Sequence, residues 1–181
     1  MMKRIYTLLF LIFTICTGSI AQSYQKTDFG IKTEINSIRI EIQFYSSSIV
    51  RILKTPQGKI SSKESLSVIK TPQKTAMVIK RNGDVLSMAS PNLKVKLNLK
   101  NGQIVFADKK GEPLLSEKAS GTAFTVFNDA GNLTYSVSQS FVLDKDEAIY
   151  GLGQQQQGKM IQRDLKLNMV QGNTDDYIPF F

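Results

Sequence analysis

The chain has 181 residues and a formal net charge of +8, with no histidine, no tryptophan and a single cysteine. Without histidine, the chain cannot form a Ser-His-Asp or Cys-His nucleophile arrangement, and a zinc site built from cysteine and histidine is also excluded. The positive charge does not indicate nucleic-acid binding, because the lysines alternate with apolar residues and no aromatic-and-arginine motif for stacking bases is present.

The first predicted element is a secretory signal peptide over residues 1–21. Two basic residues precede an apolar run at 5–21 that ends in small residues, which predicts cleavage after position 21. The run is too short for a stable membrane span. Cys16 could carry a lipid anchor, but Ile15 is bulky where a small residue normally precedes a modified cysteine. We expect an exported, periplasmic or extracellular protein with a mature domain at 22–181, and a lipid anchor as the lesser alternative.

Alternation with a period of two dominates the rest of the chain and predicts antiparallel strands with one buried and one wet face. Residues 38–45 place Ile38, Ile40, Ile42 and Phe44 on one side and Arg39, Glu41, Gln43 and Tyr45 on the other. Residues 93–100 alternate leucine or valine with lysine or asparagine without interruption. Residues 135–143 repeat the pattern through Tyr135, Val137, Phe141 and Leu143, with Gln139 as the polar interruption.

Turn-forming sequences separate these runs at short intervals. They lie at 56–58, 71–73, 82–84, 101–102, 109–112 and 128–132. Strands joined by Asn-Gly and Asp/Gly turns form hairpins. Beyond the signal peptide, no window of eleven or more residues has helical periodicity. We therefore predict an all-β fold, an antiparallel β-sandwich of two stacked sheets without disulfides.

An acidic cluster at Asp144, Asp146 and Glu147 could begin a calcium-binding loop. Position six of such a loop requires glycine but is Ile149, and position twelve requires a bidentate glutamate but is Gln155. We interpret the cluster as a solvated turn that leads into a strand, with no metal.

Asp175 and Asp176 are the second acidic pair. Adjacent carboxylates could accept hydrogen bonds from ligand hydroxyl groups, and Tyr177, Phe180 and Phe181 could supply apolar faces beside them. A hydrolase with two carboxylates needs them on opposite sides of a bond, whereas neighbours along a strand point in different directions. Ligand contact and an ordinary strand entry both remain open.

Residues 150–159 read YGLGQQQQGK, in which three glycines fall within eight positions. Such spacing indicates a backbone that turns tightly or approaches another segment closely. The glutamine amides both donate and accept hydrogen bonds. A polar loop that caps a sheet is the simplest interpretation.

Several stretches, taken in order, resemble glycoside hydrolase family 31. They are NSIRIEIQFYSSSIVRILKTP, SPNLKVKLNLKNGQIVFADKKGEPLLSE, SQSFVLDKDEAIYGLGQQQQGKM and DLKLNMVQGNTDDYIPFF. The matching motifs are Phe141, Asp146-Glu147, Tyr150-Gly151-Leu152-Gly153-Gln154, Asn173-Thr174 and Ile178-Pro179-Phe180. The similarity covers residues 28–181.

The resemblance implies a galactose-mutarotase-like supersandwich from an enzyme of the α-glucosidase or α-xylosidase type. Members of this family are typically retaining hydrolases whose two catalytic aspartates lie on a following (β/α)8 barrel. The sequence stops at Phe181, before any barrel, so no catalytic residue is carried over. The resemblance places substrate-binding positions at Asn173, Thr174, Asp175 and Asp176, and it implies no cofactor.

Two function classes follow. In the first, the chain is the sandwich domain of a secreted α-glycosidase, inactive alone, with a catalytic barrel and an α-linked oligosaccharide as partners. This hypothesis predicts an uncovered apolar surface near Tyr150, Ile178, Phe180 and Phe181. In the second, the chain is a stand-alone carbohydrate-binding module of the cell envelope, which the absence of tryptophan weakens. A sandwich used only for protein contacts is a third alternative.

Overall fold

The computed structural model describes residues 24–59, 65–66, 68–156 and 158–181. The predicted signal peptide, including Cys16, lies outside the described residues. The described residues divide into two compact units, one that ends at Phe141 and one that spans Val142–Phe181. Within the described part, no helix is long and apolar enough to cross a membrane.

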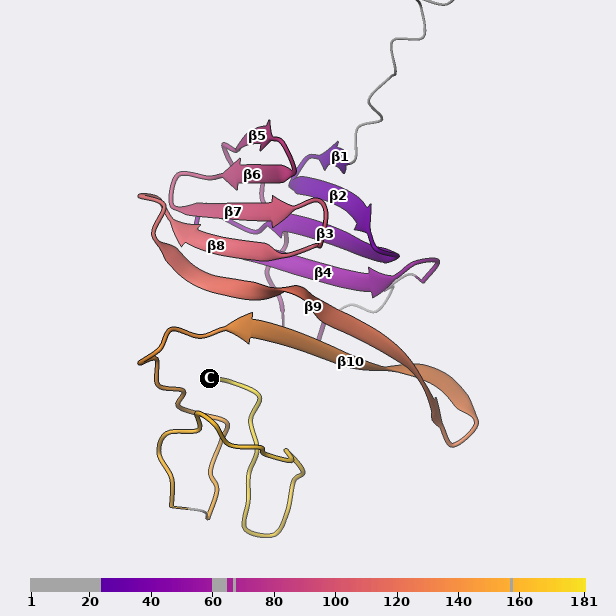
Figure 1. The fold of residues 1–181 in the computed structure, drawn as a ribbon, viewed down its shortest axis with the longest axis vertical. Helices are drawn as coiled ribbons and strands as arrows, with labels where there is room; N and C mark the ends of the chain where they lie inside the picture. The colour runs from indigo at the N-terminus through magenta and orange to yellow at the C-terminus, as the bar shows by residue number, and fades with distance from the viewer. Residues whose placement is uncertain (1–23, 60–64, 67, 157) are drawn as a thin grey trace, which may run out of the picture. The chain divides into compact units, whose positions relative to one another are not determined.

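The first unit is built from two antiparallel sheets (Figure 1). The four-stranded sheet contains, in spatial order, β1 (Tyr24–Thr27), β2 (Gly30–Ile35), β3 (Ile38–Phe44) and β4 (Val50–Pro56). The six-stranded sheet contains, also in spatial order, β5 (Val78–Asn82), β6 (Val85–Ala89), β7 (Leu93–Asn98), β8 (Ile104–Asp108), β9 (Pro113–Asp129) and β10 (Asn132–Val142). Each strand therefore lies beside its neighbour in the sequence, as short hairpin connections require.

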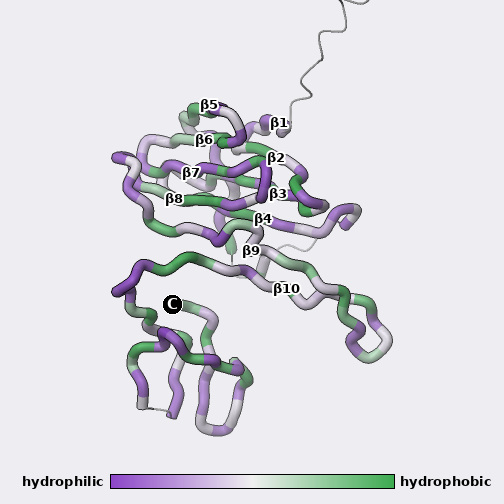
Figure 2. The backbone as a smooth tube through the Cα atoms, viewed as in Figure 1, coloured by the Kyte–Doolittle hydropathy of each residue, from purple (hydrophilic) through white to green (hydrophobic). Residues whose placement is uncertain are grey.

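The core lies between the two sheets. It contains predicted inward positions of residues 38–44 and 93–99, together with residues of β2, β6 and β8 that were not predicted from the sequence. Tyr45, predicted on the wet face, is instead buried. The fully buried members of the core are Ile31, Ile40, Ile42 and Phe44 from one sheet and Leu86, Met88, Val95, Leu97 and Ile104 from the other. Cross-strand pairing keeps these side chains on one face, since Ile31 pairs with Ile42 and Ile42 with Ile52. Hydrophobic and hydrophilic residues alternate along these strands in Figure 2. The predicted all-β sandwich is confirmed, and the described residues contain no helix.

The alternation in β10 does not mark a buried face, which corrects the prediction for residues 135–143. Val137 is 60% exposed, and Leu143 lies beyond the end of the strand. β10 is the outermost strand of the six-stranded sheet, and the turn that joins it to β9 lies away from both sheets in Figure 1. Phe124 of β9 and Tyr135 of β10 pack edge to face, with ring centroids 6.2 Å apart. The hairpin thus buries its apolar residues incompletely, and Phe124, Val137 and Phe141 border a pocket that Ile52 of the four-stranded sheet also lines.

The predicted turns mostly join adjacent strands. Gly83 and Gly102 of the two Asn-Gly turns have φ angles of 58° and 73°, a conformation that glycine adopts without a steric penalty. The turn-forming sequences at 56–58 and 71–73 are exceptions. The first follows the end of β4 and the second lies in an irregular stretch before β5, and neither makes a hairpin.

Candidate functional site

The predicted site residues belong to the second unit, where two segments lie side by side. The Gln154 N–H donates to the carbonyl of Asp176 at 2.7 Å, and the Asp176 N–H donates to the carbonyl of Gln154 at 2.9 Å. The Leu152 N–H donates to the carbonyl of Phe180 at 2.8 Å. The YGLG segment is thereby held against residues 176–180.

Gly151 and Gly153 make this close approach possible. Their φ angles are +94° and +89°, in the region that favours glycine. A Cβ atom on Gly153 would lie 1.9 Å from the carbonyl oxygen of Asp176, and one on Gly151 would lie 2.5 Å from that of Phe180. Gly158 also has a positive φ, but nothing lies within 4 Å of its Cβ position. The first two glycines are therefore required for contact between the segments, and the third only for a turn.

The glutamine run is partly used by the backbone of the same unit. The Gln155 side-chain amide donates to the carbonyl of Leu152 at 3.3 Å, and the Gln156 N–H donates to Asp175 Oδ1 at 3.1 Å. Gln157 lies outside the described residues. The prediction that this run is a polar loop beside a sheet is thus refined: it borders the segment that carries the predicted substrate-binding residues.

The four predicted substrate-binding residues occupy one loop but differ in what their side chains contact. Asp175 is partly buried, and its carboxylate accepts the hydrogen bond from Gln156. Asn173, Thr174 and Asp176 are exposed, and within the described residues their side chains make no hydrogen bond to protein. Three of the four side chains are therefore exposed and unpaired within the described residues, while Asp175 stabilises the loop.

An apolar surface borders this loop, as the sequence predicts. Tyr150, Ile178, Phe180 and Phe181 are each exposed by half or more. An exposed group of large apolar residues is typical of an interaction surface.

The acidic cluster forms a turn. The Asp144 N–H donates to Glu147 Oε2 at 2.9 Å, and Arg163 Nη1 donates to the carbonyls of both residues at 2.7 Å. Across the described ranges, no group of three or more histidine, cysteine, aspartate or glutamate residues is placed to hold a metal ion.

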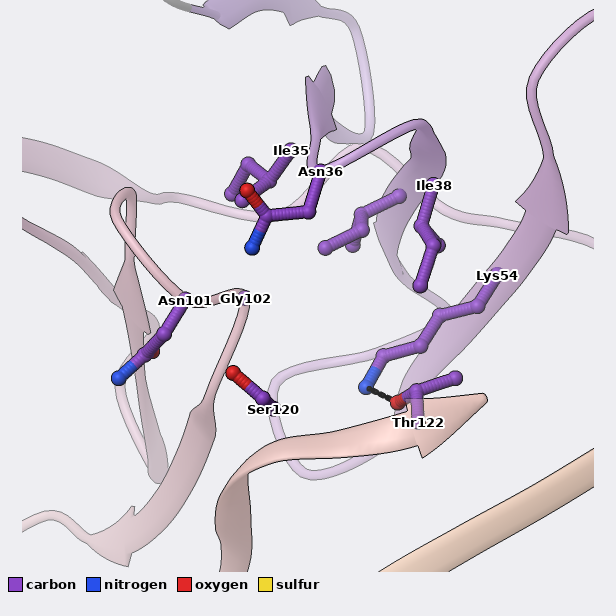
Figure 3. Close-up of a pocket in the computed structure, with 9 residues that line it drawn as sticks. Ile35, Asn36, Ile38, Lys54, Asn101, Gly102, Ser120 and Thr122 are labelled. Atoms are coloured by element: carbon purple, nitrogen blue, oxygen red, sulfur yellow. Dashed lines mark hydrogen bonds between the residues drawn. The ribbon is translucent and has the colours of Figure 1, made fainter. Parts of the chain in front are cut away.

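The sequence reasoning missed a buried ion pair in the first unit. Lys54 Nζ lies 2.7 Å from Glu117 Oε1 and Oε2, and the two side chains are only 9% and 6% exposed. Lys54 Nζ also donates to Thr122 Oγ1 at 2.8 Å, the contact drawn in Figure 3. Glu117 Oε2 accepts the Ile104 N–H at 3.0 Å. The interpretation of the lysines as a solvated surface is therefore wrong for Lys54.

The strand register indicates that the Lys54 side chain points inward. Lys54 pairs with Ile40, whose side chain faces the core, so Lys54 also points inward. Its ammonium group requires a counter-ion there, and Glu117 supplies it from 63 positions along the chain.

Comparisons with known proteins agree with one another. The family described as "Glycosyl hydrolase 31 N-terminal galactose mutarotase-like domain" matches residues 39–178. The α-xylosidase of Saccharolobus solfataricus is 31% identical over 156 residues, which are 81% of this chain and 21% of that protein. The α-glucosidase 2 of Bacillus thermoamyloliquefaciens is 28% identical over 77% of this chain and 16% of its own length.

Solved structures extend the similarity to the fold. The GH31 α-xylosidase of Xanthomonas citri superposes with a TM-score of 0.78 at 30% identity, over 86% of this chain and 17% of that one. A GH31 α-xylosidase from a soil metagenome, complexed with xylose, has a TM-score of 0.60 at 19% identity, which supports the fold alone. The alignment covers 76% of this chain and 23% of the metagenome enzyme. The chain spans about a fifth of the length of the Saccharolobus relative.

Proposed function

The chain belongs to glycoside hydrolase family 31 and matches its N-terminal galactose mutarotase-like domain. On this basis, we propose that it is the sandwich domain of an exported α-glycosidase of the α-xylosidase or α-glucosidase type. One observation carries the proposal. Sequence and structure comparisons, over 81% and 86% of the chain, both match proteins named as α-xylosidases at 30% identity or more.

In this proposal, catalysis takes place on a barrel joined to the sandwich. A retaining glycosidase needs two carboxyl groups about 5–5.5 Å apart on opposite sides of the glycosidic bond. Asp175 and Asp176 are adjacent in one loop, and Asp175 already accepts a backbone hydrogen bond. They are therefore binding groups, and the nucleophile and the acid/base come from the barrel.

The second unit would supply one wall of the sugar site. Asn173, Thr174 and Asp176 present unpaired polar side chains within the described part of the chain, suited to sugar hydroxyl groups. The neighbouring apolar surface at Tyr150, Ile178, Phe180 and Phe181 would pack on the barrel.

A chimera tests the proposal. Residues 39–178 would replace the corresponding part of the Xanthomonas citri α-xylosidase, and release of nitrophenol from p-nitrophenyl α-xyloside and α-glucoside would be measured. We expect hydrolysis by the chimera and none by the same enzyme with this part deleted. A folded chimera as inactive as the deletion would contradict the proposal.

Two variants in the chimera test the role of the loop. Asn173→Ala and Asp176→Ala should raise KM about two- to tenfold, the loss of one hydrogen bond, with little change in kcat. Asp146→Ala is the matched control, because Asp146 is an exposed acid in the turn at 144–147 and should leave KM unchanged. Equal KM values for all three variants would remove the loop from the sugar site.

Export is a separate part of the proposal and rests on the basic and apolar pattern of residues 1–21. Expression of the full chain in a bacterial host, followed by fractionation and N-terminal sequencing, should give a periplasmic or secreted product that begins at residue 22. A product that retains residue 1 in the cytoplasm would contradict it.

A further inference from the structure

A cavity of about 140 Å³ lies where the β2–β3 and β7–β8 turns meet, within the first unit (Figure 3). The two turns are in contact. The Asn36 side-chain amide donates to the carbonyl of Lys100 at 3.3 Å, and a Cβ atom on Gly102 would lie 3.4 Å from Ile40 Cδ1. The cavity is therefore formed by both sheets, and it opens to solvent beside the exposed Asn36 and Ser120.

The volume limits the size of an occupant. An engineered cavity of about 150 Å³ in another protein accommodates benzene. A cavity of 140 Å³ thus has room for one six-membered ring or a short polyol. It is too small for an oligosaccharide.

The lining combines an apolar wall with a few polar groups, the composition typical of small-molecule sites. Ile35, Ile38 and Ile40 form the wall. The Asn36 amide and the Ser120 hydroxyl face the cavity from opposite sides in Figure 3. Both residues are exposed, and within the described residues the Ser120 hydroxyl has no hydrogen-bond partner in the protein, so it is available to a ligand.

The charge of the lining excludes an ionic occupant. Lys54 contributes an ammonium group, but the Glu117 carboxylate lies 2.7 Å away and neutralises it. Thr122 Oγ1 occupies a further donor position of Lys54. No uncompensated charge is therefore present to bind an anion or a cation, which favours a neutral ligand with hydroxyl groups.

The two polar residues have a positive φ for different reasons. Asn36 (φ 51°) and Ser37 (φ 61°) form the two-residue turn that joins β2 to β3, in which a positive φ is usual. Ser120 (φ 52°) instead lies within β9. β9 is bent next to Ser120, since a Cβ atom on Gly121 would lie 2.7 Å from the carbonyl of Lys118. Serine in this conformation is uncommon, and such residues concentrate at ligand sites.

We propose that this cavity binds a small, uncharged, polyhydroxylated molecule, a monosaccharide or a short polyol. Asn36 and Ser120 bond its hydroxyl groups, and the isoleucine wall packs against its carbon atoms. The site is separate from the loop at 173–176, and it does not depend on the proposed role in a glycosidase.

Ligand-observed NMR on the full chain, with D-xylose, D-glucose and glycerol as probes, tests this assignment. We expect saturation transfer from the protein and a dissociation constant in the millimolar range for at least one probe, as its few polar contacts predict. Glucosamine and glucuronate, which carry a charge, should bind more weakly than glucose.

Three glycine variants locate the site. Ser120→Gly and Asn36→Gly remove the polar groups and relieve the positive φ, so the chain should remain folded while affinity falls about two- to tenfold. Ser37→Gly is the matched control, because Ser37 has a φ of 61°, is exposed and does not line the cavity. The affinity of the Ser37→Gly variant for the neutral probes should equal that of the original chain.

Three results would overturn the assignment: no binding of any neutral probe, unchanged affinity in both cavity variants, or an equal loss in Ser37→Gly. Binding that is abolished by Asn173→Ala would instead place the ligand at the loop. The chimera assay for the glycosidase role measures hydrolysis at the barrel, so either proposal can fail without the other.

Discussion

Replacement of Glu117 by glutamine should destabilise the sandwich more than most single substitutions. Glutamine has nearly the same shape as glutamate and can still accept the Ile104 N–H, which now donates to Glu117 Oε2 at 3.0 Å. It removes the negative charge and replaces the Oε1 acceptor of Lys54 by an NH2 donor. The Lys54 ammonium group, in a side chain that is 9% exposed, is then left without a counter-ion.

The magnitude follows from two opposing free energies. At 2.7 Å and an effective dielectric constant near 20, the attraction between the charges is about 6 kcal/mol. Removing each ion from water costs several kcal/mol, so the complete pair contributes little net stability. Breaking such a pair leaves one desolvation penalty uncompensated, which costs about 3–5 kcal/mol. Lys54→Met should cost a similar amount, and the double variant should stay within about 2 kcal/mol of the original chain.

Urea unfolding followed by far-UV circular dichroism measures these differences, provided that the slope with urea is the same for all variants. Lys100→Met is the control. Lys100 and Asp84 also form an ion pair, at 3.4 Å, but their side chains are 79% and 53% exposed. Loss of an exposed pair should cost less than about 1 kcal/mol.

Two results would refute this reasoning. A loss below about 1 kcal/mol in both single variants would show that water reaches the pair as freely as it reaches Lys100. Losses that simply add in the double variant would show that Lys54 and Glu117 are not energetically coupled.

Two further predictions concern local structure. Gly153→Ala should separate the paired segments and accelerate hydrogen exchange of the Asp176 amide by about tenfold or more, which corresponds to the loss of two hydrogen bonds. Gly158→Ala is the control and should leave this exchange rate unchanged. Equal exchange rates in both variants would contradict the role of Gly153 in the close approach. Burial acts to raise the pKa of the Asp108 carboxyl group, but hydrogen bonds from the backbone N–H groups of residues 110–112 and the charge of a nearby lysine together lower it below its usual value. The folded chain therefore favours the carboxylate, so this stabilisation is present above the unfolded pKa of about 3.9 and is lost as pH falls through the folded pKa. Asp108→Asn should lower stability at neutral pH and flatten its decline in acid, as urea unfolding at several pH values would show; parallel curves would count against it.

Alternation predicted the buried face well in β3 and poorly in β10. In β3, every predicted inward residue from Ile40 to Phe44 is buried. In β10, the same pattern leaves Val137 exposed, in a strand at the edge of the six-stranded sheet. A period of two shows that the faces of a strand differ, but it does not show what packs on either face.

The glycine-rich segment illustrates the same limit. Its spacing predicted a turn or a close approach, but the partner of Gly153 could not be named from local sequence. That partner is the carbonyl of Asp176. The predicted residues Asn173, Thr174, Asp175 and Asp176 lie in one loop because they are consecutive. Only the folded chain shows that Asp175 is already engaged by Gln156.

The amino-acid sequence by itself determined the antiparallel all-β class, the positions of most turns and the relationship to glycoside hydrolase family 31. The fold class and the turns depend on neighbours in the chain, whose alternation and turn chemistry are local, whereas the family relationship came from resemblance to motifs of known members. Tertiary structure alone decided that Lys54 meets Glu117 and that Asn36 and Ser120 face one cavity. Such contacts arise from the stacking of two sheets, and a strand's own periodicity carries no information about which residue of the other sheet will lie opposite.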